Sequence, residues 1–536
     1  MLGANKVDDP LSGKVLQDGR WNRLVLYLIL ATLCLIPLFS VRFLPFYDYH
    51  QWVFQGHLLR VHQEDPAALT EYFTWAHSPV PNSAFPAVAW LVGNLSSDPE
   101  VIAKVFLAVA IVVYTIGASY LIRSVQGRPT AVEILPLVWS YGYYVYNGFL
   151  SYHLSLGLFF LSFGYLHRAT KGGNERPAAL SVLVLMVLSI ITYSSHLFGW
   201  LPLCIAVAAY AGRIVVRQRD AKGAWLMVSL VPALLLLAWY SGERSDALNL
   251  TLYNSIPNKL SSFVAPLLLF FRLDPFEIQP PAPFILNSLV GLVVLALVAS
   301  LACRTGRRYL PISVHRAPFL AGFALLLCTT LIPFSWFGGM GVPDQRFMQP
   351  AFWTLVAAVC YRPRTWKQEA ILVPLVVSVL VVNGILFAQA QPRLKDIFET
   401  TRRVIPKGEN VYAVSLRNPP IWNSCSQQTA INLTVGIHTV QWFDLYRFMS
   451  NGGLHAGTFD TSVLIPRETN TIPQLAFAEF PRTDLEGAAE VILEADRYQF
   501  VEVFGCATDL EEVEQLLFPA FTVRARGLNF LVLSRG

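Results

Sequence analysis

The chain contains 536 residues, of which 54% are hydrophobic and only 14% are charged, and its formal net charge is +5. Globular proteins carry about 25% charged residues, so this composition excludes an ordinary soluble enzyme. The high apolar content also excludes a disordered chain, and the small, diffuse net charge excludes a nucleic-acid-binding protein. We therefore predict an α-helical polytopic membrane protein with a soluble part attached.

Charged residues are distributed unevenly along the chain. Residues 1–392 carry 27 Lys+Arg and 18 Asp+Glu, whereas the much shorter stretch 393–536 carries 13 and 17. The second part is nearly twice as rich in charge and has the size of one ordinary domain. This contrast predicts a transmembrane domain over 1–392 and a soluble domain over 393–536.

Apolar runs long enough to cross a membrane recur throughout the first part. About 20 apolar residues span the hydrocarbon core, so runs of roughly that length bounded by charge indicate membrane-spanning helices. Eleven are predicted, near 24–44, 101–122, 131–148, 149–167, 178–195, 197–214, 224–241, 284–302, 317–336, 347–361 and 369–388.

The Lys and Arg residues between these spans set the predicted orientation. Alternate loops hold 20 of these cations, while the opposite loops of the membrane part hold only seven. Since short cytoplasmic loops are rich in Lys and Arg, we expect the N-terminus to be cytoplasmic. With an odd number of spans, 393–536 is then an extracytoplasmic domain of a multi-pass protein in the cell (inner or cytoplasmic) membrane.

Three predicted outer loops carry the polar residues of interest: 45–100, 242–283 and a shorter one near 337–346. Loops this long are usually functional. In the first, Tyr49 to Gln63 is amphipathic and predicts a helix lying at the membrane interface. The apolar stretch Phe85 to Leu95 is too short to span, so we expect it to lie in or dip into the outer leaflet.

The C-terminal domain is predicted to be α/β, because short apolar runs alternate with amphipathic ones. The clearest strands are Asn410–Ser415, Phe500–Phe504 and Phe530–Leu533, and the clearest helices are Asp484–Ala495 and Leu510–Phe518. Cys425 and Cys506 lie on the oxidising side in the predicted topology. They form either a disulfide or two separately buried thiols.

Asp48 follows the first predicted span, among aromatic residues at the membrane surface. A carboxylate held there could act as a general base with a tuned pKa. Asp is also a favoured helix N-cap, and a helix is predicted directly behind it, so both roles stay open. Asp48 and His50 alone are too few ligands for a closed metal site, and a divalent metal stays possible without being required.

Histidines cluster on the predicted outer side. Six of the ten are placed there: His50, His57, His62, His77, His153 and His196. Such a ring can bind phosphate, ligate a metal, shuttle a proton, or sit at the interface as a solvated polar tip. We favour the solvated role for His57 and His62, and both kinds of role stay open for His50 and His77.

Cations in the later outer loops are candidate phosphate ligands. Arg346 lies at the mouth of a span, two residues after Asp344. Its planar guanidinium matches phosphate oxygens, although it could instead pair with Asp344 or contact lipid headgroups. Lys259 and Arg272 in the second long loop are weaker candidates of the same kind.

Taken together, these features resemble the GT-C superfamily of integral-membrane glycosyltransferases, which use polyprenyl-phosphate sugars. Protein O-mannosyltransferases and the bacterial aminoarabinose transferase are the members that the chain resembles most. The resemblance rests on Asp48, on the stretch from His77 to Pro86 with the apolar helix behind it, on the run from Asp344 to Pro350, and on the extracytoplasmic C-terminal domain.

The resemblance implies an activity and roles for particular residues. A sugar would pass from a lipid phosphate to an acceptor hydroxyl on a lipid, glycan or protein at the outer face, with inversion. Asp48 would be the reaction-centre carboxylate and Arg346 a contact to the lipid phosphate. Many relatives have a second acid where this chain has Tyr49, and some have a Lys where it has His77, so the metal requirement and the phosphate cation both stay open.

Two other functions remain alternatives at this point. A polysaccharide polymerase or ligase acting on lipid-linked glycans would have paired arginines in a large outer loop, whereas Arg244 and Arg272 lie far apart here. A transporter or flippase often shows repeats and charged groups near the membrane midplane. No repeat is evident in the sequence, and acids inside the predicted spans are almost absent.

Overall fold

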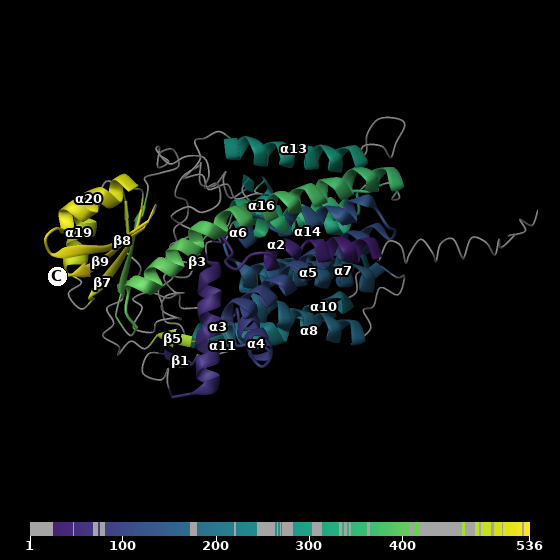
Figure 1. Cartoon of the computed structure of the whole chain (residues 1–536). Coiled ribbons are helices and arrows are strands. Elements are labelled where there is room, and N and C mark those ends of the chain that lie inside the picture. Colours follow the sequence, from purple (N-terminus) through teal and green to yellow (C-terminus); the bar gives the residue numbers. More distant parts are fainter. Residues whose placement is uncertain are drawn as a thin grey trace, which may run out of the picture.

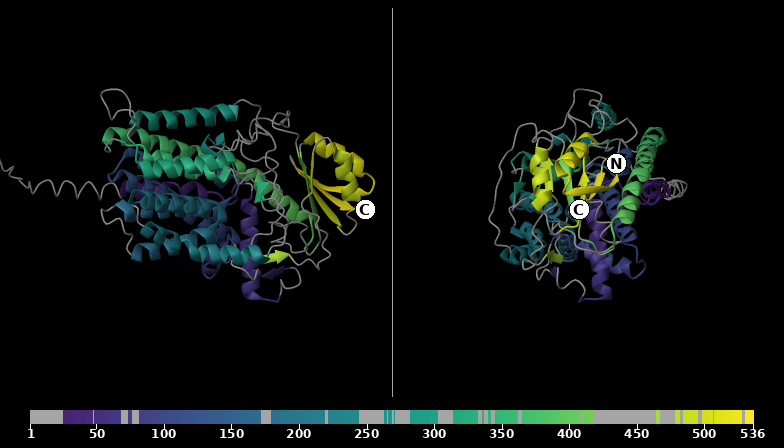
Figure 2. Two further views of the ribbon diagram at one scale, coloured as in Figure 1. Left: turned by 180° about the vertical axis from the view of Figure 1, so that it is seen from behind. Right: turned by 60° about the vertical axis from the view of Figure 1, so that its left-hand side comes forward.

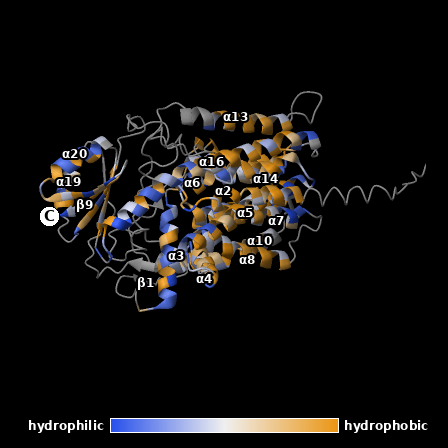
Figure 3. Ribbon diagram, in the orientation of Figure 1, coloured by the Kyte–Doolittle hydropathy of each residue, from blue (hydrophilic) through white to orange (hydrophobic). Residues whose placement is uncertain are grey.

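The computed structural model is a bundle of helices followed by a small α/β domain at one end (Figure 1). The residues it describes are 25–46, 48–67, 73–75, 81–171, 179–218, 221–243, 263–264, 266–268, 270, 282–302, 314–331, 335–336, 340–341, 345–361, 365–407, 409, 411–417, 464–466, 478–481, 484–494, 498–505, 507–527 and 530–536. Apolar residues dominate the bundle helices, as their hydropathy colouring shows (Figure 3).

The bundle helices run back and forth, so that their ends fall at two opposite faces (Figures 1 and 2). Those of the bundle are α5 Pro99–Gln126, α7 Leu150–Lys171, α8 Ala179–Ser195, α9 Leu197–Gln218, α10 Trp225–Val228, α11 Val231–Glu243, α13 Ala282–Ala302, α14 Arg316–Leu331, α15 Met348–Ala358 and α16 Trp366–Val404. Helices α5 and α7 pack so closely that a Cβ on Gly117 would lie 2.2 Å from the carbonyl oxygen of Gly157. Small residues of this kind let two membrane helices approach closely.

Among the described residues, three helices are long and apolar enough to cross a membrane: α5, most of α9 and α16. Six shorter apolar helices accompany them, at Val25–Phe39, Ala84–Gly93, Ala179–Ser195, Val231–Ser241, Asn287–Leu301 and Arg316–Leu331. The membrane-embedded helical part is therefore present. The number of eleven spans and their orientation stay predictions.

Four predicted spans differ in the structure. The helix predicted over 24–44 ends at Phe39, the last residue of α2 Ile36–Phe39. Residues 131–148 form the 3-10 helix η1 Ala131–Trp139 and the short helix α6 Tyr143–Tyr146. Pro136 lies inside η1 and Gly142 precedes α6, which interrupts a continuous α-helix. The span predicted over 347–361 is the shorter helix α15, which has only 11 residues. The span 224–241 is divided into α10 and α11 just before Pro232.

Both helices predicted between the first two spans are present, while their places at the membrane surface stay predictions. Helix α3 covers Tyr49–Glu64 and α4 covers Ala84–Gly93. Most of α3 from Tyr49 to Leu59 is buried. The helix lies roughly crosswise to the long bundle helices (Figure 1). On α4, Trp90 and Leu91 are more than half exposed. This exposure suits a helix that contacts lipid, and its predicted place in the outer leaflet stays a prediction.

The first loop and the C-terminal part lie at the same end of the bundle. Strand β1 Phe73–Trp75 of the loop pairs antiparallel with β5 Leu464–Pro466. Strands β2 Ser335–Trp336 and β3 Met340–Gly341 form a second antiparallel pair within the loop before Arg346. The β1–β5 pairing places the first loop against the C-terminal part.

The C-terminal α/β domain was predicted correctly in its described elements. Its sheet has the order β6-β4-β7-β9-β8, with β4 parallel to β6 and β7. The strands are β4 Val411–Arg417, β6 Ala478–Pro481, β7 Phe500–Phe504, β8 Phe521–Arg526 and β9 Phe530–Arg535, and the helices are α19 Leu485–Glu494 and α20 Ala507–Leu517.

The two faces of this sheet have different partners. Val501 and Val503 of β7 join a core with α19 and α20, whereas Phe500 and Phe504 join the core of the bundle. The period of two in a strand sends alternate side chains to opposite faces. Both helices therefore cover the face turned away from the bundle, as Figure 2 shows.

Helix α16 connects the bundle to this sheet. It has 39 residues and runs past the predicted domain boundary at 392/393 to Val404, shortly before β4. Near its end it also packs against β8 and β9. The division into 1–392 and 393–536 stays a prediction, with one continuous helix across it.

Candidate active site

Asp48 occupies the N-cap position of α3, and its side chain makes no capping hydrogen bond. Only 7% of the residue is exposed. Its backbone N–H donates to the carbonyl of Asn147 at 3.4 Å. The carboxylate is therefore held in the interior at the start of a helix, and the N-cap explanation does not account for its side chain.

The residue beside Asp48 must be a glycine. Gly148 has φ +75°, and a Cβ added to it would lie 2.6 Å from the backbone nitrogen of Asp48. Its carbonyl accepts a 2.7 Å hydrogen bond from the indole of Trp52, which fixes the same contact from α3. The start of α7 and the start of α3 thus touch through their backbones.

Substituting Gly148 with Ala is expected to lower the thermal unfolding midpoint. The left-handed backbone alone costs about 1–3 kcal/mol for a residue with a Cβ, and the clash with Asp48 adds to that. Gly127→Ala is the matched control, because Gly127 has φ +69° but its added Cβ would meet only the flexible end of Lys171, at 3.1 Å. Equal losses in both variants, measured by thermal unfolding, would contradict the proposed contact.

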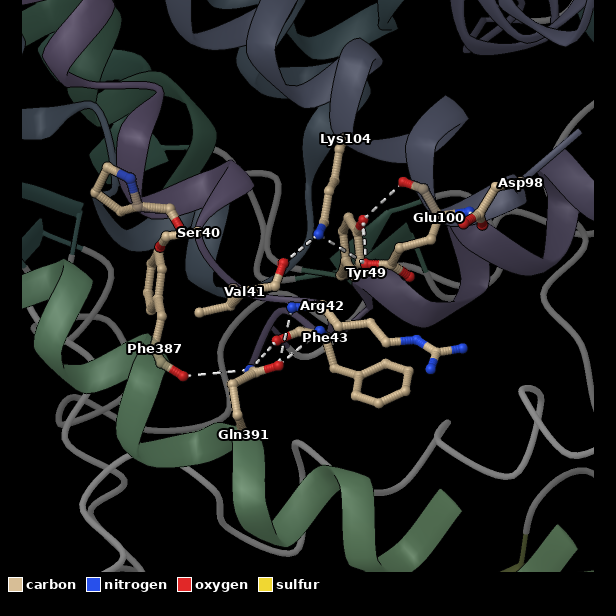
Figure 4. A network of polar contacts seen from close by, with 11 residues as sticks. Ser40, Val41, Arg42, Phe43, Tyr49, Asp98, Glu100, Lys104, Phe387 and Gln391 are labelled. Atoms are coloured by element: carbon tan, nitrogen blue, oxygen red, sulfur yellow. Dashed lines mark hydrogen bonds and ion pairs between the residues drawn. The ribbon is translucent and has the colours of Figure 1, made fainter. Parts of the chain in front are cut away.

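Gln391 of α16 holds the segment that leads to Asp48 (Figure 4). Its side-chain oxygen accepts hydrogen bonds from the backbone N–H groups of Arg42 at 3.0 Å and Phe43 at 2.9 Å. Its amide nitrogen donates to the carbonyl of Phe43. The side-chain amide therefore pairs with the backbone as a neighbouring strand would.

The opposite side of this segment is held by α5 (Figure 4). The ammonium of Lys104 donates to the carbonyl of Val41 and lies 3.8 Å from the carboxylate of Glu100. Glu100 in turn accepts a 2.9 Å hydrogen bond from the hydroxyl of Tyr49. Buried charges need such partners, and together they fix the backbone on both sides of Asp48.

Arg346 lies in an aromatic pocket at the same end of the bundle. Its guanidinium carbon is 4.9 Å from the ring centre of Phe149, 5.1 Å from that of Phe198 and 5.6 Å from that of Tyr152. Nη1 lies 3.2 Å from Nε2 of His196, while Nε is buried and has no hydrogen-bond partner among the described residues. Aromatic faces attract a guanidinium and leave its N–H groups for a ligand.

Three tyrosines fix the backbone that carries Arg346. Tyr152 donates to the carbonyl of Arg346, and Tyr144 donates to the carbonyl of Gln345 at 2.6 Å. Tyr143 donates to the side-chain oxygen of Gln345. The short helix η4 Gln345–Phe347 is thereby held against α6 and α7.

Asp48 and Arg346 are brought together by residues 147–149. Asn147 and Gly148 contact the backbone of Asp48, and the next residue, Phe149, lies against the guanidinium. Burial lowers the pKa of Arg346, while nearby tyrosines and the Asp48 carboxylate oppose the shift. A buried guanidinium that forms no ion pair with a described residue is suited to an anionic ligand.

Burial also lowers the pKa of His196 well below its ordinary value of 6.5, and Arg346 adds to the shift. The ring is therefore neutral at pH 7. Because the backbone N–H of Phe198 donates to Nδ1 at 3.1 Å, the proton is on Nε2, which lies against Nη1 of Arg346 without accepting from it. An unfolded chain would bind the proton near the ordinary value, so stability falls as the pH drops below that value.

His196→Gln is expected to flatten this dependence on pH. Each pH unit below the ordinary pKa costs the wild type up to about 1.4 kcal/mol at this one group, and Gln keeps an acceptor without titrating. Thermal unfolding measured between about pH 7 and pH 5 checks it. His62→Gln on α3 is the control. Parallel wild-type and His196→Gln curves would show that His196 does not carry the effect.

The sequence-predicted site residues have different outcomes. Asp48, His50 and Arg346 lie in the described part, and His50 is fully buried on α3. His77, Lys259, Arg272 and Asp344 lie outside the described residues, as do Cys425 and Cys506. Among the described residues no three His, Cys, Asp or Glu side chains converge, so Asp48 and His50 make an incomplete ligand set there.

Sequence reasoning did not single out the partners of Arg346. His196 appeared only as one of six outer histidines, and Tyr143, Tyr144 and Tyr152 were assigned to apolar spans. One signal was available for His196. It follows Ser194 and Ser195 in the tight turn between two predicted spans, which places a polar side chain at a helix end.

No protein-family model and no curated protein sequence matches the chain. Three chains of solved structures are similar to it, and two of them are the following. One is ArnT from Cupriavidus metallidurans in the apo state, with 11% identity over 97% of this chain and 98% of that chain, and a TM-score of 0.45. The other is the arabinofuranosyltransferase AftD from Mycobacteria, with 12% identity over 95% of this chain and 39% of that chain, and a TM-score of 0.46. Both TM-scores and both identities are low, so the activity of this chain has to follow from its own residues.

Proposed function

We propose that this chain is a membrane glycosyltransferase that moves a sugar from a polyprenyl-phosphate donor to an acceptor hydroxyl. One observation carries the proposal: residues 147–149 link the buried carboxylate of Asp48 to the aromatic-lined guanidinium of Arg346, at the end of the bundle that meets the C-terminal sheet. A base and a phosphate ligand at one end of the bundle are the two groups that this transfer needs.

In the proposed reaction, Asp48 accepts the proton of the acceptor hydroxyl. The hydroxyl oxygen forms a bond to the anomeric carbon as the bond from that carbon to the phosphate oxygen breaks, with inversion. The electron pair leaves with the lipid phosphate, whose added charge is stabilised by Arg346. Nε2 of His196 lies 3.2 Å from Nη1 of the same guanidinium.

The surroundings fit these roles in the proposal. The donor would lie in the outer leaflet of the cell membrane, with the C-terminal domain on the extracytoplasmic side. There the domain would bind the acceptor, a lipid, glycan or protein, or cover the outer loops. His77, Lys259, Arg272 and Asp344 remain proposed donor-binding residues, and a divalent metal beside Asp48 and His50 remains possible chemistry for the same step.

The proposal is tested by offering donors to the purified, full-length protein in nanodiscs. We expect a polyprenyl-phosphate sugar to raise the unfolding midpoint, because a ligand at 100 times its dissociation constant stabilises by about 2.7 kcal/mol. Turnover of the stabilising donor with an acceptor panel then identifies the transfer. Stabilisation by diphosphate-linked glycans alone would favour a polymerase or ligase, and stabilisation by no donor would contradict the proposal and favour a transporter.

A further inference from the structure

Four basic side chains from three parts of the chain meet at the end of the bundle opposite to the C-terminal sheet. They are His167 and Lys171 at the end of α7, Arg213 on α9, and His315 directly before α14. The rings of His167 and His315 lie 6.4 Å apart. Lys171 follows His167 by one turn of α7, so the two side chains share a helix face. The charges of Lys171 and Arg213 are near enough to act on the His167 ring, and that of Lys171 also acts on the His315 ring. We call these four residues the basic cluster.

His167 distinguishes the basic cluster from ordinary solvated cations. It is only 7% exposed, and its Nδ1 shares a 2.7 Å hydrogen bond with the hydroxyl of Tyr210. Its Nε2 is buried and has no partner within the described part of the chain. When Tyr210 donates to Nδ1, Nε2 carries the proton and is a donor. Buried donors nearly always have an acceptor, so this position calls for one.

The charge around His167 is also unbalanced. None of the four residues forms an ion pair with a carboxylate that the structure describes. Arg123, near the same end of the bundle, does have such a partner, since it lies 3.8 Å from the carboxylate of Glu133. Lys171 and Arg213, both exposed, are the charged members of the basic cluster, and an anion that accepts from Nε2 of His167 gains their attraction as well. The missing acceptor is therefore an anionic one.

The neighbouring surface indicates where the anion comes from. Val216, shortly after Arg213 on α9, is 80% exposed, and Leu320, shortly after His315 on α14, is 57% exposed. Apolar side chains this exposed on membrane helices face lipid tails. Basic pockets between such helices bind acidic lipid headgroups. We propose that the basic cluster is a binding site for the phosphate of an anionic phospholipid in the leaflet opposite to the C-terminal domain.

The test measures lipid binding by the full-length protein and needs no glycosyl transfer, so its result is independent of the proposed function. Phosphatidylglycerol is titrated into phosphatidylcholine nanodiscs, and the thermal unfolding midpoint gives its apparent affinity. The double variant Lys171→Gln/Arg213→Gln is expected to bind about 30-fold more weakly, since each surface cation contributes about fivefold. His167→Phe, which keeps the ring shape without donors, is expected to lose about tenfold.

The control is Arg403→Gln/Lys407→Gln, which removes the same two residue types from exposed positions at the other end of the molecule. This variant should bind phosphatidylglycerol like the wild type. Equal weakening in both double variants, or no preference of the wild type for phosphatidylglycerol over phosphatidylcholine, would overturn the site. Displacement of the lipid by millimolar inorganic phosphate would overturn its assignment to a lipid, and would identify a soluble anion instead.

Discussion

Asp48→Asn is expected to lower the rate of sugar transfer by about 10²–10⁴-fold, the usual contribution of a general base. Asn has the same shape and cannot accept the proton of the acceptor hydroxyl. The backbone contacts of residue 48 with Asn147 and Gly148 do not involve the carboxylate, so the variant should fold and enter the membrane normally. Single-turnover rates with saturating donor measure the effect.

Asp98→Asn is the matched control for this experiment. Asp98 is an exposed N-cap on α5, whose side chain accepts a hydrogen bond from the backbone of Glu100. Asn is an equally good N-cap, so the same chemical change should leave both stability and transfer nearly unchanged. A folded Asp48→Asn variant that turns over at the wild-type rate would remove Asp48 from the reaction.

Arg346→Ala is expected to lower the transfer rate by about 10²–10³-fold, the typical cost of removing one donor that stabilises a developing negative charge. The guanidinium should matter most when the lipid phosphate leaves, so kcat is expected to fall more than KM rises. Arg346→Lys should recover part of the rate. It keeps a positive charge and loses the planar group that lies between Phe149 and Phe198.

Arg60→Ala is the control for Arg346→Ala. It shows whether the transfer rate falls when any cation is removed from the same end of the bundle. Arg60 is partly exposed on α3, pairs with Glu64 at 2.8 Å and also donates to the carbonyl of Ser97. An exposed helical pair of this kind contributes only about 0.3–0.5 kcal/mol, and transfer should continue at the wild-type rate. If Arg346→Ala binds and turns over the donor as well as Arg60→Ala does, the phosphate lies elsewhere.

The sequence predicts those parts of this fold that local patterns determine. Helix α3, helix α4 and the strand β7 begin and end within a residue or two of their predicted limits, since periodicity and turn residues specify them. The prediction of one span over 131–148 is wrong, because an apolar sequence has the same pattern whether it faces lipid or is buried inside a bundle. Every residue of η1 is buried, so tertiary packing and Pro136 decide its shape.

The sequence predicts the two charged residues of the candidate site but not the residues that contact Arg346, for a related reason. Asp48 and Arg346 stand out because each is a charge at the end of an apolar run. His196 reaches Arg346 from 150 residues away, and Tyr152 reaches it from 194 residues away. Contacts between such distant residues depend on how α7, α8 and α9 pack. The spacing of residues along one chain carries no record of that packing.

Helix α16 links the C-terminal domain to the segment that leads to Asp48. Its 39 residues extend about 58 Å at 1.5 Å per residue, from one face of the bundle to the sheet. Along this length, the side chain of Gln391 forms hydrogen bonds with the backbone of residues 42–43. Residues 42–43 lead to Asp48, so a movement of the sheet that shifts α16 would also shift the segment before Asp48. In the proposed enzyme, an antibody fragment bound to α19 and α20 would therefore change turnover without contacting Asp48 or Arg346.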